Sequence, residues 1–461
     1  MYSTAKVANL AQVHKDTLLR WMRQGVIPEP ARDRHGWRMF SETEANTVVR
    51  YATANTLSSS FASEKKGAGI TADIKKLEAI DWDFAGAKTN SLTHSIHPYP
   101  AKFIPQISNA LIQELSSVGE TVADIFCGSG TTLVEALVLK RNVVGVDANP
   151  LACMISEAKT THLEQLEREA LLVLVQQAEA KAEELGLREG NTLFSGNGFR
   201  SSGWRPAAEA IKFWFDPFVI EELAEVLSWC KAVNSKGARK LALTAFSAIV
   251  VAVSRQDSDT RYVRREKKLS PGDVFKKFAR SLRDAVALSS EFSGIVEPRF
   301  QSRVVQGNLL DQPEIGSVDL IVCSPPYPNA YSYHLYHMTR MLWLEMDQPR
   351  FKKEEIGSHR KYSRKGPGGA TVETFREEMK IIFQWLRQHL RPERYACFVI
   401  GNSTIKGEHI DNADLISDAA KTQGFTETAR ISRRMQDTKK AFNPVIGKIK
   451  QEQILILKNS I

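Results

Sequence analysis

Two acidic residues and a glycine-rich turn lie at the ends of two strand-like segments. The apolar stretch that begins at Thr121 reaches Asp124 and is followed by Gly128 and Gly130, and a second stretch, 142–147, also ends in an acid. Glycines let the backbone approach a ligand closely, and the helix start that follows offers unpaired N–H groups. An acid at the tip of the second strand can accept hydrogen bonds from ribose hydroxyls. The pattern predicts a nucleoside-binding site at the carboxyl edge of a parallel sheet.

Asp124 separates this site from a dinucleotide site. A carboxylate at the end of the first strand would repel a pyrophosphate, whereas it would attract an ammonium group. S-adenosylmethionine carries an α-ammonium, a carboxylate and a ribose, so it matches the three features and is the expected cofactor. Its predicted contacts come from the two acids, the turn and the tip of a third strand: Asp124, Phe126, Gly128, Gly130, Thr131, Asp147 and Asn308.

A second group of residues with chemical potential follows a fourth strand-like segment. The tetrapeptide Ser324-Pro325-Pro326-Tyr327 ends the apolar stretch 318–323. Consecutive prolines stop a strand and fix a rigid loop. A polar side chain and a proline carbonyl can then accept both hydrogens of an exocyclic amine while Tyr327 stacks on a flat ring. The amine would be held in line with a sulfonium methyl group, so these four residues are the predicted catalytic group for amine methylation.

The Asp-x-Phe-x-Gly-x-Gly motif and the Ser-Pro-Pro-Tyr tetrapeptide together make residues 94–461 resemble the bacterial DNA amino-methyltransferases. The resemblance implies a double-stranded DNA partner whose target base is flipped out of the duplex. The serine-led tetrapeptide is typical of enzymes that methylate cytosine at N4, whereas Asp- or Asn-led versions more often methylate adenine at N6. Adenine N6, an RNA amine, and a non-catalytic DNA-binding regulator that senses the cofactor are the alternatives.

The segment His94–Gln106 directly precedes the glycine motif and contains the letters HPYPAKF. It is similar to a segment of the same family that helps to close over the methionine end of the cofactor. The resemblance implies that Lys102 pairs with the cofactor carboxylate and that Phe103 packs on the adenosyl part.

The amino-terminal residues predict two short helices joined by a tight turn, then a basic segment and a third helix. Ser41 and Glu44 have the spacing of a capping box for that third helix. The stretch resembles the winged-helix DNA-binding domain of the MerR family, although Gln12 stands where the turn usually has glycine and the long dimerisation helix is missing. The resemblance implies DNA contacts from Lys15, Arg20, Arg23, Arg34 and Arg38.

From about Thr93 onward, apolar runs alternate with helical periods, as in a parallel α/β sheet. The expected fold class is α/β, with a Rossmann-like seven-stranded methyltransferase sheet and a small α-helical winged helix-turn-helix domain. The predicted domains are 1–52 for the winged helix, 53–92 for a linker, and 93–461 for the methyltransferase domain. The last of these carries a helical insertion at about 160–300.

Charge and composition favour a polyanionic partner. Lys plus Arg outnumber Asp plus Glu by 62 to 53, for a net charge of +9. Two basic runs, 255–268 and 350–369, are candidate DNA contacts, with Arg264 and Arg364 as their representatives. A third basic group lies in the carboxyl-terminal tail: Arg430, Arg433, Arg434, Lys439 and Lys440.

Five widely spaced cysteines without a CxxC pair argue against a disulfide framework or a zinc site, and no metal is expected. No Pro-Cys dipeptide supports methylation of a ring carbon. The apolar runs fall short of a membrane span, so we expect a cytoplasmic protein without a membrane partner. A partner endonuclease or a phage-defence cluster is an expectation from the resemblance alone, and the oligomeric state is left open.

Overall fold

The computed structural model of the chain describes residues 2–11, 18, 22, 27, 29–32, 38–49, 74–102, 104–189, 198–207, 209–329, 331–364, 369–434 and 451–460. Two compact units make up the chain, Met1–Gly69 and Ile70–Ile461. Each unit has its own hydrophobic core and is described by itself.

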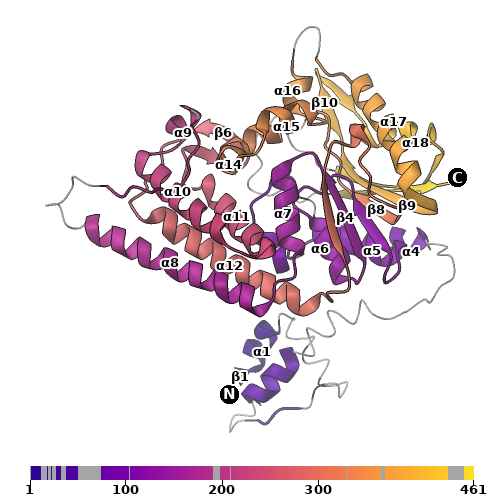
Figure 1. Cartoon of the computed structure of the whole chain (residues 1–461). Coiled ribbons are helices and arrows are strands. Elements are labelled where there is room, and N and C mark those ends of the chain that lie inside the picture. Colours follow the sequence, from indigo (N-terminus) through magenta and orange to yellow (C-terminus); the bar gives the residue numbers. More distant parts are fainter. Residues whose placement is uncertain are drawn as a thin grey trace. The chain divides into compact units, whose positions relative to one another are not determined.

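The larger unit is built around a seven-stranded sheet, which confirms the expected α/β fold class (Figure 1). The strand order is β12-β13-β9-β8-β3-β4-β7. The strands are β3 (Thr121–Asp124), β4 (Asn142–Asp147), β7 (Ser302–Gln306), β8 (Val318–Cys323), β9 (Leu390–Gly401), β12 (Phe425–Arg434) and β13 (Gln451–Asn459). Strands β7, β4, β3, β8 and β9 are parallel, whereas β13 runs antiparallel to both β9 and β12.

The strand order reverses between β3 and β8. The chain goes from β3 outward to β4 and β7, then returns to the other side of β3 to form β8. At such a switch point the connecting loops diverge to opposite faces, so a crevice opens at the carboxyl ends of the strands. Asp124 ends β3, and Ser324 directly follows β8. The topology therefore places both predicted motifs at the same edge of the sheet.

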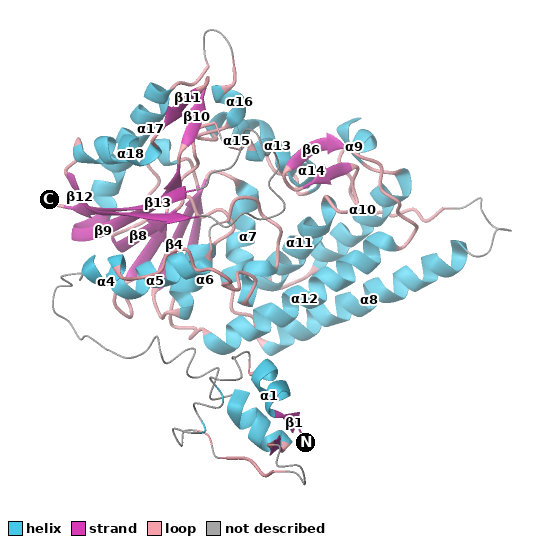
Figure 2. Cartoon of the chain, turned by 180° about the vertical axis from the view of Figure 1, so that it is seen from behind, coloured by secondary structure: helices cyan, strands magenta, loops and turns pink. Residues whose placement is uncertain are grey.

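Both faces of the sheet are covered by helices, as alternating side chains on the buried strands require (Figure 2). One face packs against α5 (Pro105–Leu115) and α6 (Thr131–Val138). The other packs against α17 (Val372–His389) and α18 (Asn412–Lys421). Neighbouring residues on β3 illustrate the alternation, since Val122 belongs to the first layer and Ala123 to the second.

The segment that precedes the sheet is part of its core, not only a linker. Helix α4 (Ile74–Glu78) and the residues after it bury Leu77 and Trp82 in the same apolar layer as α5. The indole of Trp82 donates to the Leu77 carbonyl at 2.7 Å. Residues 74–84, which the sequence assigns to the linker 53–92, therefore pack on the sheet. Ile74, Leu77 and Ile80 recur at helical spacing and pack on the same layer, so the segment carried a short periodic signal that its Ser- and Gly-rich neighbour obscured.

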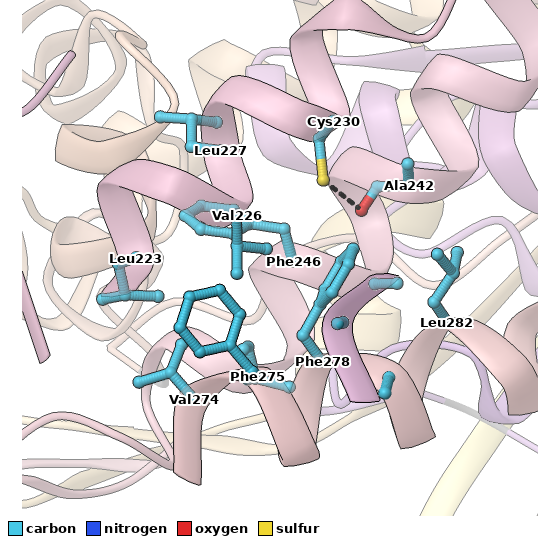
Figure 3. Packing of buried hydrophobic residues seen from close by; sticks show 14 of the residues in the cluster. Leu223, Val226, Leu227, Cys230, Ala242, Phe246, Val274, Phe275, Phe278 and Leu282 are labelled. Atoms are coloured by element: carbon cyan, nitrogen blue, oxygen red, sulfur yellow. Dashed lines mark hydrogen bonds between the residues drawn. The ribbon is translucent and has the colours of Figure 1, made fainter. Parts of the chain in front are cut away.

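The stretch 160–300 contains the helices α8 (Gln165–Glu189), α9 (Glu209–Trp214), α10 (Pro217–Ala232), α11 (Lys236–Val250) and α12 (Asp273–Ile295). Their shared core is rich in aromatic side chains, and Figure 3 shows Phe246, Phe275 and Phe278 packed between α10, α11 and α12. The Cys230 thiol donates to the Ala242 carbonyl at 3.6 Å and so ties α10 to α11. Helix α11 also contacts α7 (Pro150–Thr160), which anchors this block beside the sheet.

The same stretch is not wholly helical. Its basic run forms a small antiparallel hairpin of β5 (Gln256–Ser258) and β6 (Arg261–Arg264).

Between β8 and α17 lie four short helices, α13 (Tyr333–Tyr336), α14 (Met338–Trp343), α15 (Gln348–Glu354) and α16 (His359–Tyr362). A second two-stranded sheet pairs β10 (Ser403–Ile405) with β11 (Glu408–Ile410).

In the smaller unit, β1 (Tyr2–Ser3) pairs with β2 (Met39–Phe40), and α1 (Thr4–Leu10) and a helix at 42–49 pack on a core that includes Leu18 and Met22. The predicted capping box is confirmed. The Ser41 amide donates to Glu44 Oε2 at 2.6 Å, and the Glu44 amide donates to Ser41 Oγ at 3.2 Å. The second predicted helix, 17–24, lies largely outside the described residues.

Among the helices that the structure describes, none has the length and apolar character needed to cross a bilayer.

Candidate active site

A cavity of about 220 Å³ opens at the carboxyl ends of β3, β4 and β8. It brings together residues that lie far apart in the sequence. Most of the residues predicted for cofactor binding and catalysis line it: Lys102, Asp124, Phe126, Gly128, Thr131, Asp147, Asn308, Ser324, Pro325, Pro326 and Tyr327. Gly130 stands behind the turn, outside the lining, and Phe103 lies outside the described residues.

Asp147 links the two loops of the predicted cofactor site. Its Oδ2 accepts a hydrogen bond from the Gly128 amide at 2.8 Å, and its Oδ1 accepts one from the Asn149 amide at 2.8 Å. Burial raises the pKa of this carboxyl to about 6, although the two amide bonds oppose the shift. The acid thus holds the glycine turn in place and still reaches the cavity.

Asp124 is almost fully buried at the end of β3. Its Oδ1 accepts from the Phe126 amide at 3.1 Å. Burial raises its pKa to about 7, and the nearby Asp147 adds to the shift although hydrogen bonds from Thr132 and from the Phe126 amide oppose it. A cationic group in the cavity would restore the charged form, so the site has the electrostatics of an ammonium acceptor.

The turn between the acids needs glycine at position 130. Gly130 has φ +77°, and a Cβ there would lie 2.9 Å from Ser156 Oγ and 3.1 Å from Ser156 Cα. The Ser156 hydroxyl donates to the Gly128 carbonyl at 2.9 Å and so braces the turn from α7. The absence of a side chain at Gly130 therefore serves packing against α7 and not a ligand contact.

The Ser-Pro-Pro-Tyr loop is held from two sides. The Thr132 hydroxyl donates to the Val322 carbonyl at 3.2 Å, which joins the helix after the glycine turn to β8. On the other side, a Cβ added to Gly357 would lie 3.0 Å from the Tyr327 carbonyl oxygen and 3.2 Å from that of Pro326. The loop therefore has backbone packed directly against it.

Several aromatic residues in the cavity wall were not predicted. The rings of Tyr99 and Tyr333 stack with their centroids 5.8 Å apart. The ring centroid of Tyr331 lies 5.7 Å from that of Tyr333. The Tyr333 amide donates to Glu355 Oε1 at 2.5 Å, and the second oxygen of Glu355 bonds His334 Nδ1 at 2.5 Å. The sequence signal that could have indicated Tyr331 and Tyr333 is the dense run of tyrosines directly after the Ser-Pro-Pro-Tyr loop, whereas Tyr99 belongs to the HPYPAKF segment.

Two lysines converge on one carbonyl beside the cavity. Lys102 Nζ donates to the His94 carbonyl at 3.1 Å, and Lys159 Nζ donates to the same oxygen at 3.2 Å. Lys159 is completely buried, and burial together with Lys102 lowers its pKa well below the usual range. Among the described ion pairs, neither ammonium has a carboxylate partner. Lys102 lines the cavity and Lys159 does not, so Lys102 is the residue of this pair that could meet an anion there.

The two basic runs, 255–268 and 350–369, differ in the contacts and the exposure of their cationic side chains. In the hairpin, Arg264 pairs with Glu266 at 2.8 Å and lies 5.1 Å above the Phe213 ring. In α15 and α16, and just after them, Lys352, Arg360 and Arg364 are exposed. Because Phe351, Glu354 and Gly357 of the same segment line the cavity, these cations lie near its mouth.

Among the basic residues predicted for the smaller unit, Arg38 is the one that the structure describes. Arg38 Nε pairs with Glu29 Oε1 at 2.6 Å. Lys15, Arg20, Arg23 and Arg34 lie outside the described residues.

Two family models match the chain. Residues 28–158 match a family described as DNA methylase, and residues 2–53 match the MerR HTH family of regulatory proteins. The DNA methylase match spans less than half of the chain. The matched segment includes Asp124, the glycine turn and Asp147, but it ends before the Ser-Pro-Pro-Tyr loop.

Curated relatives carry names of the same kind. The chain is 32% identical over 174 residues to Type II methyltransferase M.MvaI of Kocuria varians, which covers 37% of this chain and 36% of that protein. It is 39% identical over 85 residues to Type II methyltransferase M.MjaII of Methanocaldococcus jannaschii, covering 17% of this chain and 16% of that protein. The chain therefore matches well under half the length of these two relatives.

Similar solved structures include TTHA0409 of Thermus thermophilus in complex with S-adenosyl-L-methionine, at 18% identity and a TM-score of 0.20. That match covers 33% of this chain and 52% of the other. TrmN from Thermus thermophilus matches at 10% identity with a TM-score of 0.30, over 100% of this chain and 80% of the other. These scores are low, and the fold assignment follows from the strand order itself.

Proposed function

We propose that the larger unit transfers a methyl group from S-adenosylmethionine to an exocyclic amine of DNA, with N4 of cytosine as the target atom. The observation that carries this proposal is a single cavity lined both by the acids of the glycine motif and by Ser324 and Tyr327. The DNA methylase match supports the reaction class, and the serine-led tetrapeptide favours cytosine over adenine N6.

The donor set fits the cofactor. Asp147 would accept hydrogen bonds from the ribose, Asp124 would receive the α-ammonium, and Lys102 would pair with the carboxylate. The raised pKa of Asp124 supports this assignment, because the ammonium group of the cofactor would stabilise the charged form of this buried carboxyl. The cofactor supplies the electrophilic methyl group. The protein binds and orients both reactants and excludes water from the cavity.

The amine would be held by the Ser324 hydroxyl and a carbonyl of the two prolines that follow, while Tyr327 stacks on the base. Both acceptors draw the nitrogen lone pair out of conjugation with the ring, and alignment with the methyl group supplies much of the acceleration. A base can enter this cavity only after it leaves the duplex.

The exposed basic residues of α15 and α16 are the proposed contacts to the DNA backbone near the flipped base, with Arg364 at their end. Arg264 is a weaker candidate because its guanidinium contacts Glu266 and lies over the Phe213 ring. The MerR match supports a second DNA contact from the smaller unit, including Arg38. The relatives named as Type II methyltransferases support the methyltransferase assignment, and a partner endonuclease stays a prediction from the family resemblance.

The test is expression of the chain in a methylation-free host, followed by sequencing that detects modified bases and their modified atom. We expect N4-methylcytosine at one short motif. N6-methyladenine would overturn the choice of base only, and an unmodified genome would overturn the catalytic proposal.

Variants locate the chemistry within the cavity. Ser324→Ala and Tyr327→Ala should abolish modification and keep cofactor affinity nearly unchanged, and the exposed Ser317→Ala is the matched control. Loss of both modification and cofactor binding in Ser324→Ala would show that the amine site is misplaced.

A further inference from the structure

We propose that Glu452 is a positioning residue that holds the ring of Tyr327 as a preformed stacking platform for the target base. The inference rests on the proposed function, because it assigns a role to a residue that the Ser-Pro-Pro-Tyr motif does not contain. Glu452 lies on β13, far along the chain from the tetrapeptide, and lines the same cavity.

The contact is direct. The Tyr327 hydroxyl donates to Glu452 Oε1 at 3.1 Å and also approaches the Val399 carbonyl at 3.5 Å. Burial, together with the nearby Glu452 charge, raises the pKa of Tyr327 well above its usual range, so the hydroxyl keeps the proton that it donates. The ring is therefore fastened at its far end, while the two prolines restrain the backbone at its near end.

Glu452 is itself fixed by a buried chain of contacts. Its second oxygen pairs with Arg433 on β12, and the two side chains are 8% and 7% exposed. Arg433 Nε donates to the Trp82 carbonyl at 3.0 Å. A buried carboxylate needs such a counter-charge. Because the side chains in this series of contacts are buried, the Glu452 oxygen that accepts from the Tyr327 hydroxyl has a defined position before any base arrives.

This arrangement explains a feature that the reaction alone does not. Stacking on a base needs only an aromatic ring, yet the hydroxyl of Tyr327 is bonded to a buried acid. A ring that is already oriented loses less conformational freedom when the flipped base stacks on it. Loss of the bond should therefore weaken capture of the base. It should leave cofactor binding unchanged, because the hydrogen bonds of Glu452 go to Tyr327 and Arg433 and not to the glycine turn.

The experiment is a double-mutant cycle with Tyr327→Phe, Glu452→Ala and the double variant. The substrate is a duplex that carries the motif found by base-modification sequencing. We expect each single change to lower kcat/KM for DNA about tenfold, as expected for one hydrogen bond to a charged group. The double variant should be no slower than the slower single variant, because both changes remove the same bond. Cofactor affinity, measured by calorimetry, should stay within about twofold, since neither change touches the cofactor residues.

Two readouts separate positioning from general structural damage. Fluorescence of 2-aminopurine at the target position should show less captured base in Tyr327→Phe than in the wild type, while the melting temperature stays the same. If Glu452→Ala fails to fold because Arg433 is left unpaired, the paired variant Glu452→Ala/Arg433→Met takes its place. Tyr395→Phe, in the apolar layer on β9, is the control for loss of a tyrosine hydroxyl.

Wild-type kcat/KM in Tyr327→Phe, or effects of the two single changes that multiply in the double variant, would overturn the role of Glu452. Absence of methylation by the wild-type protein would instead overturn the proposed function, so the two failures are distinguishable.

Discussion

The carboxylate of Asp147 accepts a hydrogen bond from the backbone amide of Gly128 at 2.8 Å. This bond joins the loop after β4 to the loop after β3, so one side chain shapes both walls of the proposed cofactor site. The other oxygen of Asp147 accepts from the Asn149 amide. Each carboxylate oxygen of Asp147 thus accepts a hydrogen bond from one backbone amide. A side chain that replaces Asp147 must accept both hydrogen bonds.

Asp147→Asn should weaken binding of S-adenosylmethionine by about 10- to 100-fold, the range for loss of a hydrogen bond to a charged group. The reason is that an asparagine has one acceptor oxygen, so its NH2 group must face one of the two amide donors. Calorimetric titration measures the effect, and the exposed Asp284→Asn on α12 is the control. Equal affinity in Asp147→Asn and wild type would remove Asp147 from the site.

Cofactor affinity should fall as the pH falls through 7. The pKa of Asp124 is raised to about 7 in the unliganded protein, so the acid is increasingly neutral below that pH and loses its attraction for an ammonium group. One linked proton gives a slope that approaches about tenfold per pH unit. In titrations between about pH 6 and about pH 8.5, the wild-type affinity should be nearly constant at the upper end and should fall increasingly steeply below about pH 7, whereas Asp124→Asn should give a weaker, flatter response. A flat wild-type profile would contradict the ammonium assignment.

The same acid should make the unliganded protein less stable at higher pH. A carboxyl whose pKa is higher in the folded than in the unfolded state takes up a proton on folding, so its contribution to stability is lost as the pH rises through about 7. Melting temperatures of wild type and Asp124→Asn should diverge in favour of the asparagine variant as the pH rises from about 4 to about 7, and the difference should then stay constant. Saturating cofactor should reduce the difference.

Gly130→Ala should destabilise the protein by about 1–2 kcal/mol from the left-handed backbone alone. The clash with Ser156, whose Cα lies 3.1 Å from the added Cβ, adds to this cost. Gly186→Ala on α8 is the matched control, because nothing lies within 4 Å of its Cβ position. That change should stabilise the helix by about 0.5–1 kcal/mol. Denaturant unfolding measures both, and an equal effect at the two positions would show that the turn does not need glycine.

Removal of the charges of Lys352 and Lys353 should weaken DNA binding at low salt. It should also lower the salt dependence by about one unit for each phosphate that the protein no longer neutralises. Both side chains are exposed on α15 beside the cavity mouth. Arg264→Ala should have a smaller effect, because its charge is already paired with Glu266. Binding isotherms over a range of salt concentrations measure the slopes, and a larger effect in Arg264→Ala would move the DNA contact to the hairpin.

The elements that carried the clearest local patterns were predicted well. The strands that end at Asp124, at Asp147 and just before Ser324 are short apolar runs bounded by glycine or proline, and each one is present. The capping box of Ser41 and Glu44 was equally local. The predictions failed where contacts between distant segments determine the structure, as they do at Trp82. They also failed where an ordinary basic run forms a hairpin inside a helical region.

The sequence alone determined three features: a glycine turn, an acid at the end of each of two strands, and a serine and a tyrosine on a loop stiffened by two prolines. It could do so because strand ends and turns depend on neighbouring residues. Only the tertiary structure decided that Tyr327 meets Glu452, that Lys102 and Lys159 share one carbonyl, and that Arg264 pairs with Glu266. These contacts follow from the strand order and from which faces pack together. Both arise from the free energy of burying the whole core, which no local pattern encodes.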